Sequence, residues 1–128
     1  MITKITHITL FVNNQTQAAD FYIQNFGFKI HTDLMFGSMR WLTLNLPEQH
    51  DLELVIKLAQ TPEEQSLVGK QNGSTNPLCF ATTNCQADYE KLTELGVEFL
   101  AQPEEHPWGI AATCQDLSGN FIYLCQSF

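Results

Sequence analysis

Apolar residues alternate with polar ones in several short runs of this chain, which is the pattern of β-strands with one buried face. In residues 4–13, Ile8, Leu10 and Val12 fall on one side, and His7 falls on the other. Similar runs predict further strands at residues 28–35, 39–46, 51–58, 78–83, 97–101, 110–115 and 121–126. The chain is therefore expected to be built largely of short strands.

Two other stretches have apolar residues at helical spacing, and each of them ends at a glycine. One stretch precedes Gly27, and the other, residues 86–95, precedes Gly96. The two helix patterns match at an offset of 69 residues, and the strands before them match at an offset of 70. This repeat predicts two βαβββ modules at about residues 1–58 and 77–128, joined by a linker at about residues 59–76.

Neither module is large enough to bury a sizeable core alone, so the two are expected to pair as one α+β domain over residues 1–128. Each sheet would place one face on its helix and curl the other around a shared central cleft. Strand alternation assigns several aromatic and polar side chains to that cleft, namely Phe11, Trp41, Thr43, Phe121 and Tyr123. Aromatic walls with few polar groups are the usual composition of a small-molecule pocket.

Composition and charge narrow the classes of partner. The formal net charge is −8, which argues against nucleic acid and anionic membranes. No apolar run approaches the roughly 20 residues that span a bilayer, and no secretory signal is visible, so a cytoplasmic location is expected. The four cysteines form no CxxC pair and are interpreted as structural free thiols: Cys79, Cys85, Cys114 and Cys125.

His7 and Glu53 are the residues best suited to chemistry. An imidazole and a carboxylate on nearby strands suit a divalent ion such as Zn²⁺, Ni²⁺, Mn²⁺ or Fe²⁺, or the two side chains bond to each other without a metal. His31 and His50 have no companion at ligand spacing and are expected at the surface. Residues 106–109, which include Trp108, form either a lid over the cleft or a tight packing turn.

Four segments together resemble the vicinal oxygen chelate superfamily, also called the glyoxalase/bleomycin resistance/dioxygenase superfamily. They are residues 6–12 (THITLFV), 21–28 (FYIQNFGF), 52–55 (LELV) and 116–124 (DLSGNFIYL). The resemblance covers essentially the whole chain. It implies the glyoxalase/bleomycin resistance/dihydroxybiphenyl dioxygenase fold, in which two βαβββ modules form a curled mixed sheet around a cleft, and it implies a homodimer.

The resemblance also bears on metal binding, because metal-dependent members use two strand positions from each module. His7 and Glu53 match the positions of the first module. The equivalent positions of the second module are Pro77 (or Asn76) and Tyr123, where the family usually has a glutamate in place of the tyrosine. Half of the expected donor set is therefore missing.

These observations lead to one favoured function and one alternative. The favoured function is a glyoxalase/bleomycin-resistance-like protein that binds a small molecule, without a complete metal centre, through Phe11, Trp41, Thr43, Trp108, Phe121 and Tyr123. The alternative is a metal-dependent lyase (lactoylglutathione-lyase-like) or dioxygenase that uses His7 and Glu53 as metal ligands. A metal-free enzyme with Glu53 as a catalytic base is a further possibility.

Overall fold

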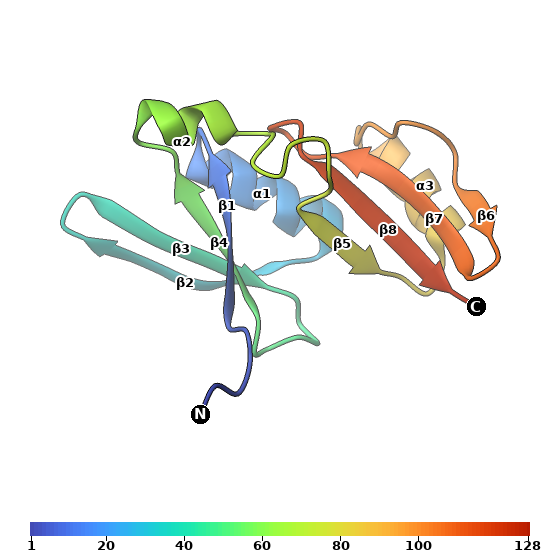
Figure 1. Cartoon of the computed structure of the whole chain (residues 1–128), viewed down its shortest axis with the longest axis horizontal. Coiled ribbons are helices and arrows are strands. Elements are labelled where there is room, and N and C mark those ends of the chain that lie inside the picture. Colours follow the sequence, from blue (N-terminus) through green and yellow to red (C-terminus); the bar gives the residue numbers. More distant parts are fainter. The chain divides into compact units, whose positions relative to one another are not determined.

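The computed structural model describes the whole chain, residues 1–128, as two compact units, Met1–Val68 and Gly69–Phe128. Each unit is a four-stranded mixed sheet with a helix, in the order βαβββ (Figure 1). The elements are β1 (His7–Val12), α1 (Gln15–Phe26), β2 (Lys29–Phe36), β3 (Met39–Asn45), β4 (Glu53–Leu58), α2 (Pro62–Leu67), β5 (Leu78–Ala81), α3 (Cys85–Glu94), β6 (Glu104–His106), β7 (Gly109–Gln115) and β8 (Phe121–Ser127). The predicted α+β fold of two βαβββ modules is confirmed.

The sheet of the first unit has the strand order β1-β4-β3-β2, with β1 and β4 parallel and the other neighbours antiparallel. One of its faces packs against α1. Gln15 of this helix donates hydrogen bonds from Nε2 to the backbone oxygens of Arg40 and Ile56, at 3.1 and 2.9 Å. Leu42, Leu44 and Ile56 are fully buried on this side, so the helix face carries the core.

Both long helices begin after an asparagine and end shortly before a glycine, and the two glycines are those at which the sequence pattern ends each helix. The side chain of Asn14 accepts from Gln17 N at the start of α1, and that of Asn84 accepts from Ala87 N at the start of α3. Gly27 ends α1 with φ 77°, a left-handed conformation that glycine adopts without steric cost. Local sequence therefore sets the helix boundaries in both units.

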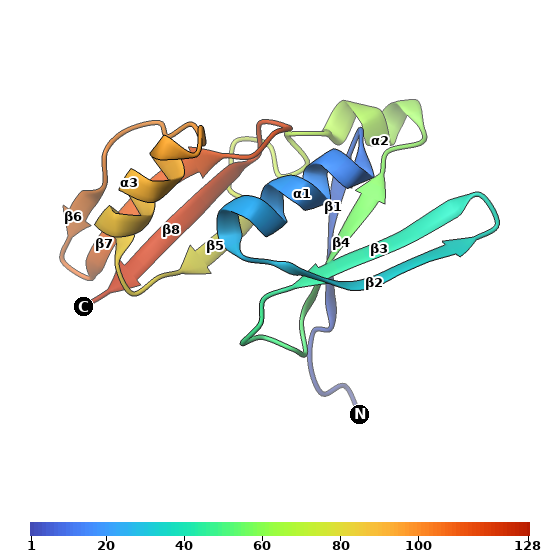
Figure 2. The ribbon, with the colours of Figure 1, turned by 180° about the vertical axis from the view of Figure 1, so that it is seen from behind.

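The second unit repeats the plan with the strand order β5-β8-β7-β6. Figure 2 shows α3 lying across β7 and β8. The turn between these two strands is held by Asp116, whose Oδ1 accepts from Ser118 N and Asn120 N at 2.9 Å each. Its Oδ2 accepts from Asn120 Nδ2 at 2.9 Å, and both side chains are buried. This part of the family motif is therefore structural.

The strand predicted at residues 97–101 is wrong in position. Only Phe99 forms a bridge there, opposite Cys114, and the second strand of the second unit is β6. Leu100 N still donates to Thr113 O at 3.0 Å, but the chain bends at the next residues. Pro103 has no N–H to continue the ladder, so pairing resumes only beyond it.

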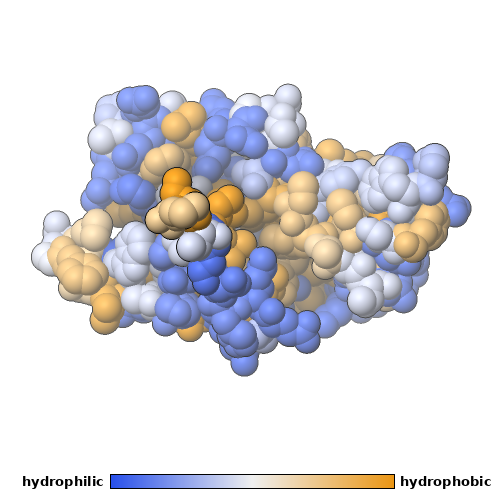
Figure 3. Space-filling model, turned by 60° about the horizontal axis from the view of Figure 1, so that its bottom comes forward, coloured by the Kyte–Doolittle hydropathy of each residue, from blue (hydrophilic) through white to orange (hydrophobic).

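The β2–β3 hairpin exposes large apolar side chains. Its residues Leu34, Met35, Phe36 and Met39 are all exposed. Figure 3 shows the apolar surface at the tip of this hairpin, at the left-hand edge of the view. β2 is also an edge strand, so one side of its backbone pairs with no other strand of the sheet.

Helix α2 lies in the segment predicted as a linker and packs against β1. Thr61 is its N-cap and accepts from Glu64 N at 3.1 Å, and Pro62 occupies the first helical position. None of the three helices is long and apolar enough to cross a membrane.

Candidate functional site

The parallel pairing of β1 with β4 brings the two predicted chemical residues together. His7 lies directly opposite Glu53 in the ladder, and His7 Nε2 is 3.2 Å from Glu53 Oε2. The other ring nitrogen, Nδ1, is 2.8 Å from Thr6 Oγ1. The exposed fractions of the two side chains are 38% for His7 and 18% for Glu53, so the carboxylate is partly shielded while the imidazole stays accessible.

Thr43 and Trp41 of β3 lie on the same face as this pair. Thr43 is fully buried and donates from Oγ1 to Glu53 Oε1 at 2.8 Å. The ring of Trp41 is 5.9 Å from that of His7, at an interplanar angle of 50°. We call this side of the first sheet the His7 face, and strand register assigns to it His7, Thr9, Phe11, Trp41, Thr43, Glu53, Val55 and Lys57.

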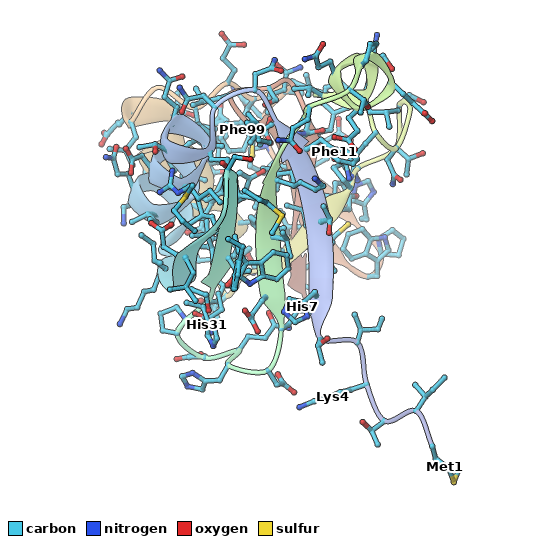
Figure 4. All side chains as sticks on the ribbon, turned by 90° about the vertical axis from the view of Figure 1, so that its left-hand side faces the viewer. Met1, Lys4, His7, Phe11, His31 and Phe99 are labelled. Atoms are coloured by element: carbon cyan, nitrogen blue, oxygen red, sulfur yellow. The ribbon has the colours of Figure 1, made fainter.

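A third residue, His31, joins the cluster, and the sequence interpretation missed it. Its Nδ1 is 3.0 Å from Glu53 Oε1 and 2.8 Å from Thr32 Oγ1. Figure 4 shows the labelled side chains of His7 and His31 at the same end of the sheet. His31 does lie at the surface as expected, with 43% of its side chain exposed. The expectation that it has no companion is wrong, because it contacts Glu53.

The reason for the miss is an irregularity in β2. The β2–β3 register shifts between Ile30 and Thr32, which leaves His31 as an extra residue in its strand. An inserted residue breaks strict alternation and re-aims a side chain, which is a common role of β-bulges. Simple alternation places His31 and Thr32 on opposite faces, and no feature of the sequence marks the shift.

The donors of the cluster are not arranged around a common point, as the ligands of a metal ion would be. The described residues contain no group of three or more His, Cys, Asp or Glu side chains that could hold one. His7 faces Oε2 and His31 faces Oε1, so the imidazoles bracket the carboxylate. A metal site instead requires its donors to converge on one point at about 2.0–2.2 Å. Members of this type of fold often use divalent metals, but the donors in the first unit bond to each other.

The remaining candidate of the first unit, Phe11, lies on the same face but further along β1. It is half-buried and sits opposite Lys57 in the ladder. A hollow of about 90 Å³ lies near this end of the sheet, and its lining includes Met39, Trp41 and Val55. Trp41 thus borders both the polar cluster and an apolar hollow.

In the second unit, Tyr123 lies opposite Cys79 in the parallel ladder, and Pro77 precedes β5. The equivalent positions Pro77 and Tyr123 therefore do not lie opposite each other in the ladder. Burial raises the pKa of the Tyr123 phenol, and the nearby Cys125, Cys79 and Glu104 raise it further. A phenol that resists ionisation is a poor metal ligand, because metals bind the deprotonated form.

Tyr123 also lines a hollow of about 230 Å³ in the second unit. Glu104, His106 and Thr113 contribute polar groups to its wall. Phe121 is half-buried on β8, two residues before Tyr123. Trp108 lies in the tight β6–β7 turn and is exposed, and its ring stacks on His106 at 5.2 Å with an angle of 5°.

The cysteines divide into two groups. Cys85 and Cys114 are fully buried, whereas Cys79 is exposed and Cys125 is half-buried, and all four are free thiols. Burial raises the pKa of the Cys114 thiol to about 12. Because the thiolate is the reactive form, Cys114 is an inert core residue.

Comparison with known proteins identifies the family. A family model described as the Glyoxalase/Bleomycin resistance protein/Dioxygenase superfamily matches residues 4–124, and the chain belongs to this superfamily. It is 30% identical to an uncharacterized protein of Shewanella frigidimarina (strain NCIMB 400), covering 98% of this chain and 95% of that protein. The predicted family and the glyoxalase/bleomycin-resistance-like class of the protein are confirmed.

Solved structures agree with this assignment. The structure of UcmS2 has a TM-score of 0.85 and 29% identity, with 98% of each chain covered. TnmS3, an antibiotic binding protein from Streptomyces sp. CB03234, has a TM-score of 0.80 and 31% identity, covering 99% of this chain and 98% of that one. The neighbours of this chain thus include an antibiotic-binding protein.

Proposed function

We propose that this protein binds an aromatic small molecule on the His7 face, without a bound metal. The similarity to TnmS3, over nearly the whole of both chains, is the observation that carries this proposal. An accessible indole next to a polar cluster supports it, because Trp41 offers a stacking surface beside the His7 imidazole. Phe11, half-buried on the same face, is also proposed to contact the ligand, whereas the fully buried Thr43 holds Glu53 in place.

The acidic character of the chain favours a cationic or uncharged ligand over an anionic one. The formal net charge is −8, and Glu53 supplies a carboxylate at the centre of the cluster. An aromatic ring with a positive charge would gain both stacking on Trp41 and attraction to the carboxylate.

Calorimetric titration with bleomycin and with flat cationic dyes tests this proposal. Trp41→Ala is expected to weaken binding by about tenfold or more, because an aromatic contact at the centre of a site dominates its affinity. Leu117→Ala is the control, since this exposed apolar residue lies in the β7–β8 turn of the other unit. Wild-type protein that binds no member of the panel would contradict the proposal.

The second candidate function is a metal-dependent lyase or dioxygenase that uses His7 and Glu53 as ligands. It is favoured by their 3.2 Å proximity on the predicted strands. Titration with Zn²⁺, Ni²⁺, Mn²⁺ and Fe²⁺ distinguishes the two. Stoichiometric binding that His7→Ala abolishes would replace the metal-free proposal, and glutathione adducts and catechols would then be the substrates to assay. Glu53 as a base in a metal-free reaction would be tested with the same substrates.

We further propose that the protein is a cytoplasmic homodimer. The exposed apolar side chains of the β2–β3 hairpin are suited to contact a second copy of the chain. Light scattering coupled to size exclusion would measure the mass, and Phe36→Lys at this hairpin is expected to shift the mass toward that of the monomer.

A further inference from the structure

His31 offers a hydrogen-bond acceptor to the ligand, and its tautomer follows from the charges around it. Its Nδ1 lies 3.0 Å from a Glu53 carboxylate oxygen and 2.8 Å from the Thr32 hydroxyl oxygen, and both oxygens can accept from one N–H. A nitrogen lone pair at that distance from a carboxylate oxygen would be repelled, whereas an N–H is attracted. We therefore assign the ring proton of a neutral His31 to Nδ1, which leaves the lone pair on Nε2.

His7 has the opposite arrangement. Its Nε2 faces the other carboxylate oxygen at 3.2 Å, so the proton of a neutral ring belongs on Nε2. Its Nδ1 then accepts from the Thr6 hydroxyl at 2.8 Å. Both ring nitrogens of His7 are thus engaged within the protein, and His7 has no acceptor left for a ligand.

Glu53 is held so that it can orient His31. Thr43 donates to the oxygen that also faces His31, and this threonine is fully buried. An imidazole whose Nδ1–H is fixed by a carboxylate presents Nε2 in a defined direction. The His31 side chain is 43% exposed, and the structure gives its Nε2 no protein partner.

We propose that His31 Nε2 accepts a hydrogen bond from a hydroxyl group on the bound aromatic molecule, so that the site selects phenol-type ligands over their ethers. This inference rests on the proposed function and adds the chemical group that the site recognises. His31 is then a specificity residue, and the bulge in β2 places its side chain in the cluster.

The test compares 2-naphthol with 2-methoxynaphthalene, which has the same ring but no hydroxyl donor, by ligand-observed NMR titration. Wild-type protein is expected to bind 2-naphthol about fivefold more tightly, the value of one neutral hydrogen bond. His31→Phe is expected to bind both probes equally. The matched control is His50→Phe, an exposed histidine outside the cluster, which should retain the preference.

Two conservative variants separate the nitrogens of His31. His31→Asn keeps a donor near the Nδ1 position and should lose the preference, whereas His31→Gln places an acceptor near the Nε2 position and should restore part of it. Imidazole ¹⁵N spectra at about pH 8 should show the Nδ1–H tautomer for His31 in the wild type. An Nε2–H tautomer would overturn the inference.

The outcomes also separate a failure of this inference from a failure of the proposed function on which it rests. If neither probe binds wild-type protein, the proposed function fails for aromatic ligands, and the inference fails with it. If both bind wild type equally, or if the preference survives in His31→Phe, the inference alone is wrong and the aromatic site remains.

Discussion

The two units share a fold but differ in the residues that lie opposite each other across their two parallel strands. Across β1 and β4, His7 lies opposite Glu53, whereas across β5 and β8, Cys79 lies opposite Tyr123. The helix-side features are common to both, including an asparagine N-cap before each helix and a glycine with positive φ after it. Packing and capping therefore preserve the module, while the opposite face of the sheet is free to change its chemistry.

The same contrast appears in the polar residues that each unit buries. In the first unit, Thr43 is turned toward Glu53 of the cluster. In the second, Asp116 and Asn120 bond to their own turn. Thr43 therefore supports the proposed site of the first module, whereas Asp116 and Asn120 stabilise a turn of the second. The following three predictions test that contrast.

The largest expected effect is on stability, from Asp116→Ala in the second unit. This change leaves the three donors of the β7–β8 turn without their acceptor, two backbone N–H groups and one side-chain amide. The free energy of unfolding should fall by about 3 kcal/mol, because unpaired buried donors each cost of order 1–3 kcal/mol. Urea denaturation measures the loss. Asp51→Ala, an exposed aspartate 3.7 Å from Lys4, should change stability little.

A second prediction gives the second unit the chemistry of the first. Cys79→His combined with Tyr123→Glu would put an imidazole opposite a carboxylate across β5 and β8. The coupling free energy between the two substitutions is expected to be about 1 kcal/mol, because a partly shielded ion pair contributes roughly that much. Urea denaturation of the wild type, the two single variants and the double variant measures it. A coupling near zero would mean that more than side-chain identity separates the units.

The third effect is negligible at neutral pH and appears only in alkaline solution. Burial holds the folded-state pKa of Cys114 at about 12, against an ordinary thiol value of 9.0. A raised pKa means that the unfolded chain loses this proton first, so stability is full below about pH 9 and falls as pH rises toward 12. In Cys114→Val, thermal unfolding followed by circular dichroism should show a shallower decline over this window. Thr113→Val, which removes no thiol, should leave the decline as steep as in wild type.

Local sequence signals were sufficient for most of the fold. Periodicity placed most of the strands, and Gly27 marked the end of α1 because capping depends on neighbouring residues alone. The pattern failed at residues 97–101, where Val97 and Phe99 alternate as in a strand. There, the ladder depends on a long-range partner, and Pro103 interrupts it.

The site was accessible to sequence reasoning only where strands are regular. His7 and Glu53 could be paired because both lie in uninterrupted ladder positions. His31 could not, since a register shift depends on how two strands meet and leaves no mark on composition or periodicity. Tyr123 lies in the strand predicted for it, opposite Cys79.

The bulge in β2 has a consequence for how such a site can be gained or lost. Because β2 is an edge strand with one free side, it can absorb a one-residue insertion without disturbing a neighbour beyond β3. A single codon added or removed near position 31 would therefore bring an imidazole to Glu53 or take it away, while the core opposite α1 kept its packing. Two relatives of equal overall identity could then differ in ligand preference through one gap in their alignment.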